Sequence, residues 1–259
     1  MKISIITVVY NGQIFLEDCI QSVISQSYKN IEYIIIDGGS TDKTLPIIDK
    51  YKAFISNSLS ESDQGLYDAI NKGIKLASGK VIGLLNSDDM FAANNVISEI
   101  ASAFTENSKI DAVYGDLNYI TSNEGIVIRV WKSKQANFQD ITNGWMPAHP
   151  TLYIKKDIIE QYGNYAVDLG TAGDYDFILR YFYTNRLNAL YIPKLMVNMR
   201  LGGVSNRNLE SLLGAIKNDY NALKRNKVRY PIWVLIKKKL SKFLQFWHAL
   251  IDHLHNQRS

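Results

Sequence analysis

Short apolar runs alternate with helical patterns along the first 90 residues. The first run is β-branched and closes at Tyr10-Asn11-Gly12, after which apolar residues recur at three-and-four spacing. The alternation then repeats, which predicts strands at Ile3 to Val9, Tyr33 to Ile36, Ala53 to Ser56 and Lys80 to Leu85, and helices at Phe15 to Ile24, Ser40 or Thr41 to Tyr51, and Gly65 to Ala77. Strands that are apolar on both faces and alternate with helices indicate an α/β fold with a parallel, doubly wound sheet.

After Asp89 the alternation becomes less regular. The pattern predicts a helix at Asn94 to Thr105, strands at Ala112 to Tyr119 and Gly125 to Trp131, irregular chain as far as Pro150, a helix at Asp174 to Thr184, and short strands at Ala189 to Ile192 and Leu195 to Met199. The loop Leu201-Gly202-Gly203-Val204-Ser205 and a helical tail follow. We therefore expect a main domain at 1–205, divided near residue 90, and a helical extension at 206–259.

Composition narrows the class of protein. The chain has 259 residues, of which 46% are hydrophobic and 21% charged, enough for one large α/β domain. The lone Cys19 forms no internal disulfide and lies in an apolar helical pattern, so we interpret it as a buried hydrophobic residue. No run approaches the roughly twenty apolar residues of a membrane span, and the chain opens directly on a strand, so we expect a cytoplasmic protein.

The basic charge belongs to the tail. Residues 224–259 contain nine Lys or Arg against Asp252 alone, whereas the remaining chain contains 20 basic and 24 acidic residues, so we expect no nucleic-acid partner. Residues 230–254 form a basic amphipathic pattern that includes Trp233 and Lys237. Such a helix lies on an anionic membrane surface, packs on the main domain or forms a homodimer seam, and the pattern leaves the three open.

Acidic residues follow three of the predicted strands. Asp37 ends the second strand, Asp63 lies after the third, and Asn86-Ser87-Asp88-Asp89 ends the fourth. Ligands of open parallel sheets bind at the carboxyl ends of the strands. Adjacent carboxylates beside an apolar strand need water, hydrogen bonds or a metal, because burying unpaired charge is costly. Asp88 and Asp89 therefore predict a divalent-cation site, with a helix cap formed by Ser87 and Asp88 as the alternative.

Five motifs in this order resemble the family 2 glycosyltransferases of the GT-A type, over most of the first 205 residues. They are Ser4-Ile5-Ile6-Thr7-Val8-Val9-Tyr10-Asn11, Ile34-Ile35-Ile36-Asp37-Gly38-Gly39-Ser40-Thr41-Asp42, Asp63-Gln64-Gly65-Leu66-Tyr67-Asp68-Ala69-Ile70-Asn71-Lys72-Gly73, Asn86-Ser87-Asp88-Asp89 and Ala172-Gly173-Asp174-Tyr175-Asp176. The resemblance implies a GT-A, Rossmann-like, mostly parallel sheet flanked by helices, with a nucleotide-sugar-binding half at 1–90, an acceptor half at 91–205 and the helical tail.

The same resemblance implies an activity. Family members transfer a sugar from a nucleotide diphosphate with inversion and with Mn²⁺ or Mg²⁺. We expect a UDP-hexose or UDP-N-acetylhexosamine donor, and a saccharide or undecaprenyl-diphosphate-linked acceptor in surface polysaccharide or O-antigen assembly. The basic tail would then bring the enzyme to the inner face of the cytoplasmic membrane.

The resemblance assigns site residues one by one. Thr7, Val9 and Tyr10 match a nucleobase wall, and Asp37 matches the carboxylate that accepts a base N–H, which favours uracil. The expected nucleotide-sugar-binding residues are Thr7, Val9, Tyr10, Asp37, Asp63, Tyr67, Asp68, Lys72, Asn86, Asp88 and Arg200, and the expected metal ligands are Asp89, Asp88 and His149. His149 is equally consistent with a structural residue or an acceptor contact.

Two positions depart from the family pattern. Asn86 stands where many relatives have Asp, so the ribose contact is either weaker or made by Asp88, and Ile70 stands where many have Arg. The donor's diphosphate must therefore find a cation elsewhere, and we expect Lys72 or Arg200 to supply it. Tyr67 and Asp68 mark a recognisable branch of the family.

Asp174 matches the catalytic base of inverting members. Displacement at the anomeric carbon needs a carboxylate that takes the proton of the acceptor hydroxyl on the face opposite the departing diphosphate. Asp176 lies four residues before Arg180, which favours a structural ion pair over a catalytic role.

Two other functions fit parts of the pattern. A sugar-nucleotide nucleotidyltransferase also uses a doubly wound sheet and an acidic metal site, but usually has a glycine-rich basic loop after the first strand, where this chain has Tyr10-Asn11-Gly12-Gln13. A non-catalytic nucleotide-sugar-binding protein would not need Asp88, Asp89 and Asp174 together. The glycosyltransferase is the better prediction.

Overall fold

The computed structural model describes residues 1–201 and 209–240, and the side chains of 209–212 lie outside this description. The elements of the first half are β1 (Ile3–Val9), α1 (Leu16–Ile24), β2 (Ile31–Asp37), α2 (Thr44–Lys50), η1 (Lys52–Phe54), β3 (Asn57–Ser60), α3 (Leu66–Leu76), β4 (Val81–Leu84), β5 (Met90–Phe91) and α4 (Val96–Glu106). Those of the second half are β6 (Ala112–Ile120), β7 (Val127–Trp131), α5 (Phe138–Thr142), η2 (His149–Thr151), β8 (Tyr153–Lys155), α6 (Lys156–Tyr162), η3 (Gly170–Ala172), α7 (Gly173–Ile178), η4 (Leu179–Thr184), β9 (Ala189–Arg200) and α8 (Leu209–Arg225).

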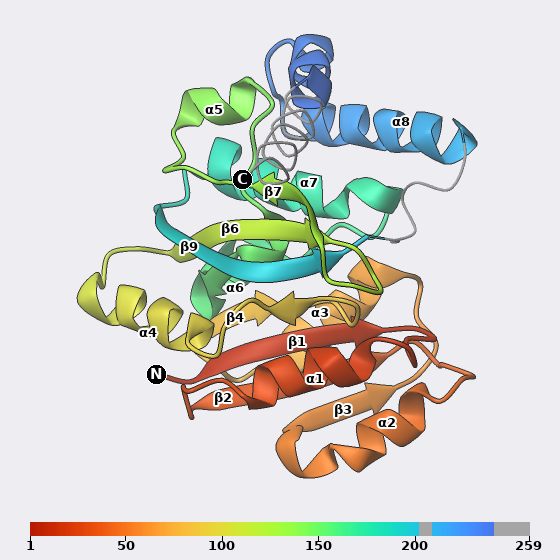
Figure 1. The fold of residues 1–259 in the computed structure, drawn as a ribbon. Helices are drawn as coiled ribbons and strands as arrows, with labels where there is room; N and C mark the ends of the chain where they lie inside the picture. Colours follow the sequence, from red (N-terminus) through yellow and green to blue (C-terminus); the bar gives the residue numbers. More distant parts are fainter. Residues whose placement is uncertain (202–208, 241–259) are drawn as a thin grey trace, which may run out of the picture.

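One mixed sheet runs through the molecule (Figure 1). Within the described residues its order is β3-β2-β1-β4-β8-β6-β9-β5, and β7 pairs with β6. The strands of the first half are parallel where they pair, as are β6 and β9, whereas β8, β5 and β7 run antiparallel to their neighbours. The predicted α/β fold with a doubly wound first half is therefore confirmed.

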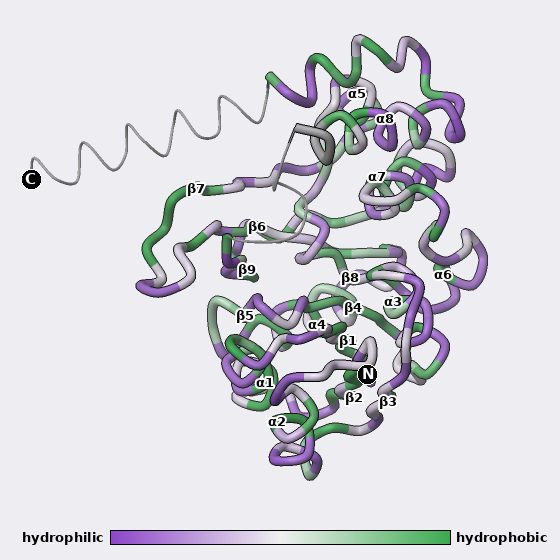
Figure 2. Tube along the Cα trace, turned by 90° about the vertical axis from the view of Figure 1, so that its right-hand side faces the viewer, coloured by the Kyte–Doolittle hydropathy of each residue, from purple (hydrophilic) through white to green (hydrophobic). Residues whose placement is uncertain are grey.

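The first strand is mostly apolar because both of its faces are buried, and its two polar side chains, Ser4 and Thr7, are hydrogen-bonded within the core. Ile5 and Val9 face α1 and α4 on one side of the sheet, and Ile6 and Val8 face α3 on the other. In Figure 2 the strands β1, β2 and β4 accordingly lie in the hydrophobic interior. A parallel strand covered on both sides needs a mostly apolar sequence. Polar side chains that reach a ligand can lie only at or beyond its ends.

The third strand lies later than predicted. The predicted segment Ala53 to Ser56 begins inside η1, and β3 occupies Asn57–Ser60 instead. This edge strand pairs with β2 alone and is polar and mostly exposed, so no apolar run marks it. The start of α2 also differs from the prediction of Ser40 or Thr41, because the N-cap residue is Lys43, whose side chain makes no cap hydrogen bond. The N–H of Thr44 donates to Oδ1 of Asp42 at 2.9 Å in the turn before the helix.

Three predictions for the second half were incomplete. The stretch predicted as irregular contains α5, which begins with a capping box between Asn137 and Asp140. The strand β8 and the helix α6 follow it, and α6 was not predicted. The two short strands predicted after residue 188 form one strand, β9, because the register shift between Tyr114 and Asp116 of β6 absorbs the irregular residues opposite.

The C-terminal helices cover α7 at the end of the molecule far from α2 (Figure 1). Val234 and Leu235 of a helix at 231–240 belong to the core, and the Nζ atom of Lys238 pairs with Asp219 at 2.9 Å above the Tyr175 ring. Residues 231–240 of the predicted amphipathic helix therefore pack on the main domain. Residues 241–259 lie outside the described chain, as do residues 202–205 of the predicted loop. Among the helices of the described segments, none has the length and apolarity needed to cross a bilayer.

Candidate active site

The carboxyl ends of β1 and β2 meet the loop after β3 and form an open shelf. Tyr10 follows β1 with 65% of its surface exposed, although a large aromatic side chain is normally covered. A Cβ atom at Gly38 would lie 2.5 Å from Oδ2 of Asp63 and 3.5 Å from the Tyr10 ring. Gly38 thus leaves the space between an exposed ring and a carboxylate open.

Asp37 closes this shelf from below. Its Oδ2 atom accepts hydrogen bonds from Oγ of Ser60 at 2.6 Å and from the N–H groups of Ser40 and Gly39 at 3.1 and 3.2 Å. Among the described residues, its Oδ1 atom accepts only one hydrogen bond, a long one of 3.4 Å from the N–H of Ser40. The side chain is 1% exposed, so the turn holds it rigidly and leaves Oδ1 as the oxygen with spare acceptor capacity.

Thr7 and Val9 contribute to the shelf through the backbone. The hydroxyl of Thr7 lies 3.1 Å from that of Tyr33, in the core beneath α1, so this side chain points away from the shelf. The carbonyl of Val9 accepts the N–H of Gly38 at 2.9 Å. Among the three predicted wall residues, Tyr10 alone presents its side chain to solvent.

Lys72 and Asp68 brace the loop that carries Asp63. The Nζ atom of Lys72 lies 2.9 Å from Glu61 and 3.4 Å from Asp68, and it donates to the carbonyl of Ser62 at 3.1 Å. The hydrogen bond to Glu61 is the main cause that raises the pKa of Lys72. This cation is therefore already neutralised by carboxylates, and its predicted phosphate contact remains a prediction.

The two carboxylates of the acidic motif lie in different environments. Asp89 is fully buried, and it accepts the Asn86 amide at 2.9 Å on Oδ2 and the N–H of Arg200 at 3.3 Å on Oδ1. Burial and the charge of Asp88 raise the pKa of Asp89 well above its usual range. Asp88 is only partly buried, and within residues 1–201 and 209–240 no other residue donates a hydrogen bond to its carboxylate. Asp88 is thus the carboxylate that is free to bind a ligand.

Arg200 lies beside this motif and ties it to α1. Its guanidinium donates to Oδ2 of Asp18 at 2.6 Å and to the carbonyl of Asp88 at 3.1 Å, and it covers the Phe15 ring at 4.6 Å. The side chain is 8% exposed. The structure therefore places a positive charge next to Asp88 and anchors it to the carboxylate of Asp18, and the predicted contact of Arg200 with the donor phosphates remains a prediction.

Asp174 lies in the first turn of α7 with one oxygen held and one open. Its Oδ1 atom accepts the N–H of Tyr175 at 2.7 Å and the hydroxyl of Tyr67 at 3.2 Å. In the described part of the chain no group donates to Oδ2. By contrast, Asp176 is 1% exposed and bonds Arg180 at 3.3 Å and the Asn226 amide at 2.8 Å, which confirms its structural role.

His149 faces the same region from η2. Its Nε2 atom lies 2.7 Å from the hydroxyl of Tyr165, and burial lowers its pKa, with the negative charge of Asp174 opposing this effect. Because Tyr165 engages Nε2, only Nδ1 is left for a metal contact through this histidine, and that contact remains a prediction.

Three residues of the β6–β7 hairpin join the site without a sequence signal. The rings of Tyr119 and Trp131 stack with centroids 6.4 Å apart, and the guanidinium of Arg129 lies 4.6 Å from the Tyr119 centroid. Burial raises the pKa of Tyr119, Arg129 opposes this, and the charges of Asp89 and Asp174 add to it. The Tyr119 side chain thus lies within electrostatic range of both carboxylates. Only the pairing of β6 with β7 brings these residues together, and no motif marks them.

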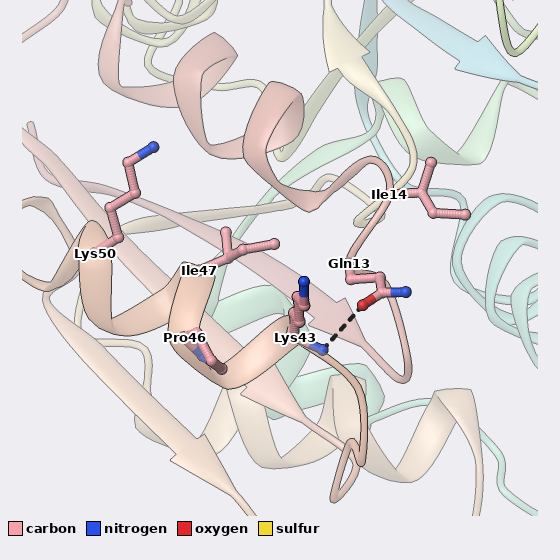
Figure 3. A pocket seen from close by; sticks show the side chains of 6 residues that line it. All are labelled: Gln13, Ile14, Lys43, Pro46, Ile47 and Lys50. Atoms are coloured by element: carbon pink, nitrogen blue, oxygen red, sulfur yellow. Dashed lines mark hydrogen bonds between the residues drawn. The ribbon is translucent and has the colours of Figure 1, made fainter.

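Among the described residues the site holds no ready cluster of metal ligands, and the surface hollow of Figure 3 lies elsewhere. Within the described residues, no three His, Cys, Asp or Glu side chains gather as a metal site. A hollow of about 480 Å³ lies between the loop before α1 and the helix α2 (Figure 3). It is lined by Gln13, Ile14, Lys43, Pro46, Ile47 and Lys50, and none of these is a predicted site residue.

Comparison with known sequences assigns the chain to a family. A family model described as Glycosyl transferase family 2 matches residues 4–163, more than half of the chain, and the protein therefore belongs to this family of glycosyltransferases. A PGL/p-HBAD biosynthesis glycosyltransferase of Mycobacterium bovis is 27% identical over 210 residues, which cover 78% of each chain. An uncharacterized glycosyltransferase of Haemophilus influenzae is 30% identical over 209 residues, or 78% of this chain and 80% of that protein.

Solved structures confirm the GT-A fold. S. aureus TarS 1–349 in complex with UDP-GlcNAc superposes with a TM-score of 0.68 at 19% identity, covering 88% of this chain and 66% of that one. The mannosyltransferase PcManGT from Pyrobaculum calidifontis, in complex with GDP-Man and Mn²⁺, superposes with a TM-score of 0.63 at 15% identity, covering 96% and 72%. The chain spans only 39% of the longer TarS structure. The family assignment therefore favours a glycosyltransferase over the two alternatives, a nucleotidyltransferase and a non-catalytic binding protein.

Proposed function

We propose that the protein is a metal-dependent, inverting glycosyltransferase with a UDP-hexose or UDP-N-acetylhexosamine donor. The observation that carries this proposal is the Oδ2 atom of Asp174, to which no described residue donates a hydrogen bond. Oδ1 of the same side chain bonds Tyr67 at the start of α3, the helix that follows the Asp63 loop of the shelf. The charges of Asp174 and of Asp89, next to Asp88 in the acidic motif, both act on Tyr119. A base, a metal ligand and a nucleobase platform are what a direct displacement of a nucleoside diphosphate requires.

The shelf fits a uracil base. Tyr10 offers an exposed ring face for stacking, and Oδ1 of Asp37 can accept the N–H of the base at the floor. Asp63 borders the gap over Gly38. The UDP-GlcNAc and UDP complexes of the structural neighbour TarS support a uridine donor, whereas the GDP-Man complex of PcManGT represents the alternative base.

The acidic motif suits Mn²⁺ or Mg²⁺. Both ions prefer oxygen ligands, and Mg²⁺ commonly binds through one or two carboxylates together with substrate phosphates. Asp88 would hold the ion, and Asp89, braced by Asn86 and the Arg200 backbone, would support the turn that presents Asp88. When bound, the ion offsets the charge of the departing diphosphate. The Mn²⁺ complex of PcManGT supports this cofactor.

Asp174 would carry out the proton transfer. Its Oδ2 atom takes the proton of the acceptor hydroxyl as the hydroxyl oxygen bonds the anomeric carbon and the diphosphate leaves from the opposite face. Inversion of the anomeric centre follows from this single displacement. Arg200 holds the backbone carbonyl of Asp88 and so fixes the turn during the reaction.

A panel of UDP-Glc, UDP-Gal, UDP-GlcNAc and UDP-GalNAc, with GDP-Man as the control, tests the donor. We expect Mn²⁺-stimulated release of UDP from one of the uridine donors, and isothermal titration should show UDP binding only with a divalent ion. Equal UDP binding in EDTA, or turnover of GDP-Man alone, would contradict the proposal.

We also propose that the tail brings the enzyme to a lipid-linked acceptor on an anionic membrane. The outward face of helix 231–240 and the turn before it expose apolar side chains beside basic ones. These are Tyr230, Ile232, Trp233, Ile236 and Leu240, with Arg229, Lys237 and Lys239. Apolar residues flanked by Lys and Arg bind anionic bilayer surfaces, each nearby cation adding about 1 kcal/mol.

Vesicle co-sedimentation of the full chain tests this surface. The double variant Trp233→Ser/Ile236→Ser should bind vesicles containing anionic lipid several-fold more weakly, because both side chains are exposed and make no core contact. Leu213→Ser on α8, where the leucine is 61% exposed, is the matched control and should bind like the wild type. Unchanged binding of the double variant would leave packing on the main domain or the homodimer seam as the role of the tail.

A further inference from the structure

Two stacked tyrosines lie next to Asp174, the proposed catalytic base. Tyr67 belongs to the first turn of α3 and Tyr165 to the loop after α6, and their ring centroids are 5.9 Å apart with the planes 7° from parallel. Each directs its hydroxyl at a candidate site residue. That of Tyr67 lies 3.2 Å from Oδ1 of Asp174, and that of Tyr165 lies 2.7 Å from Nε2 of His149.

The Tyr67 hydroxyl donates to the Asp174 carboxylate, because a carboxylate oxygen accepts. Burial raises the pKa of Tyr67 and of Tyr165 far above the working range of an enzyme, so both remain protonated. The Tyr67 proton is shared between Asp174 and the carbonyl of Thr171, which lies 3.1 Å from the hydroxyl oxygen. Together with the N–H of Tyr175, this donor occupies Oδ1 of Asp174 and leaves Oδ2 as the open oxygen.

The tyrosine pair is itself held in place from both sides. The Asn71 amide bonds the backbone of Tyr165 reciprocally, at 2.9 and 3.0 Å, which joins α3 to the loop. The Tyr165 ring stacks on Phe177 of α7 with centroids 4.0 Å apart. The pair therefore connects α3, the loop and α7 into one rigid unit.

Gly173 shows how closely the Tyr67 ring approaches the turn that carries Asp174, the proposed catalytic base. A Cβ atom at position 173 would lie 2.6 Å from the Tyr67 ring and 2.8 Å from the carbonyl of Ala166. Only glycine permits the first turn of α7 to rest on the ring, so the residue before Asp174 is a condition of the Tyr67 contact.

We propose that Tyr67 is a positioning residue that holds Asp174 so that Oδ2 faces the acceptor hydroxyl, and that Tyr165 keeps Tyr67 in this place. This inference rests on the proposed function of Asp174 as the base. It replaces the donor contact that the sequence suggested for Tyr67, since the hydroxyl is engaged by α7 and the ring is 9% exposed. During transfer the proton passes from the acceptor hydroxyl to Oδ2, and Tyr67 keeps its own.

The Tyr67→Phe variant of the full chain tests the assignment by separating kcat from KM. We expect kcat to fall about tenfold, because one hydrogen bond to the carboxylate is lost, while the donor KM stays within about twofold. A residue that binds the donor would instead raise the donor KM. Tyr181→Phe is the matched control, because its hydroxyl bonds Gly163 at 2.9 Å at the distant end of the same aromatic stack, and kcat should stay within about twofold.

A double-mutant cycle with Asp174→Asn identifies the route of the effect. Because Tyr67 acts through Asp174, Tyr67→Phe should add no further loss of transfer in the Asp174→Asn background. Wild-type turnover in Asp174→Asn overturns the base assignment itself. Loss of turnover in Asp174→Asn with unchanged kcat in Tyr67→Phe overturns the positioning role alone, as does a raised donor KM with unchanged kcat.

If Tyr67→Phe melts below the assay temperature, the variant Gly173→Ala tests the same proposal. Gly173→Ala retains every hydroxyl but forces the Tyr67 ring away from α7. It should lower kcat and leave UDP binding intact. Wild-type kcat in a folded Gly173→Ala protein would contradict the proposal.

Discussion

The Asp174→Asn variant is expected to bind UDP and Mn²⁺ like the wild-type chain and to transfer sugar at least about 10²-fold more slowly. Asparagine keeps the size of the side chain, and its carbonyl oxygen can still accept the N–H of Tyr175 and the hydroxyl of Tyr67. The group at the open position then becomes an amide, which accepts no proton at neutral pH. UDP release measured with acceptor present gives kcat, and isothermal titration gives the UDP affinity.

Asp176→Asn provides the contrast two positions away. Asp176 is buried against Arg180 and Asn226, so loss of its charge leaves the guanidinium poorly compensated. We expect a lower melting temperature and a kcat within about threefold of the wild type for the folded protein. Wild-type turnover in Asp174→Asn would remove the base assignment, and a large loss of kcat in a stable Asp176→Asn protein would move the base to that carboxylate.

The second large effect is expected at Asp88. Asp88→Asn should weaken Mn²⁺-dependent UDP binding by about 10- to 100-fold with an unchanged melting temperature, because its carboxylate makes no hydrogen bond to another described residue. Titration of UDP with and without Mn²⁺ measures the effect. Binding in EDTA should be the same for variant and wild type.

Asp89→Asn should fail in another way. The buried carboxylate accepts hydrogen bonds from the Asn86 amide and the Arg200 N–H, so an amide at this position turns one donor toward another. We expect a clearly lower melting temperature. If Asp89→Asn instead keeps its melting temperature and loses Mn²⁺ dependence, while Asp88→Asn binds normally, the ligand role that the sequence assigned first to Asp89 is restored.

The sequence by itself determined the class of fold and the strand ends that carry the candidate site residues. A strand such as Ile3–Val9 must be mostly apolar because helices cover both of its faces, and this leaves a clear pattern. Its two polar residues, Ser4 and Thr7, are hydrogen-bonded in the core. Polar residues that bind ligands then lie at or beyond the strand ends, which located Asp37 and the acidic motif at one edge. An edge strand such as β3 leaves no such pattern. The predicted strand at Ala53 to Ser56 therefore lay before the observed strand at Asn57–Ser60.

The tertiary structure alone decided which atoms are available for chemistry. Sequence motifs placed Tyr67, Lys72, Asp89 and Arg200 in a donor or metal site, but each is engaged by a partner distant in the chain or by a neighbouring loop. Whether a carboxylate is open depends on the donors around it, and those donors can come from distant segments. The N–H of Arg200, for example, bonds Oδ1 of Asp89 from 111 residues away. Asp88 and Asp174 thereby emerge as the open carboxylates, because burial and hydrogen bonding are properties of packed neighbours and not of spacing along the chain.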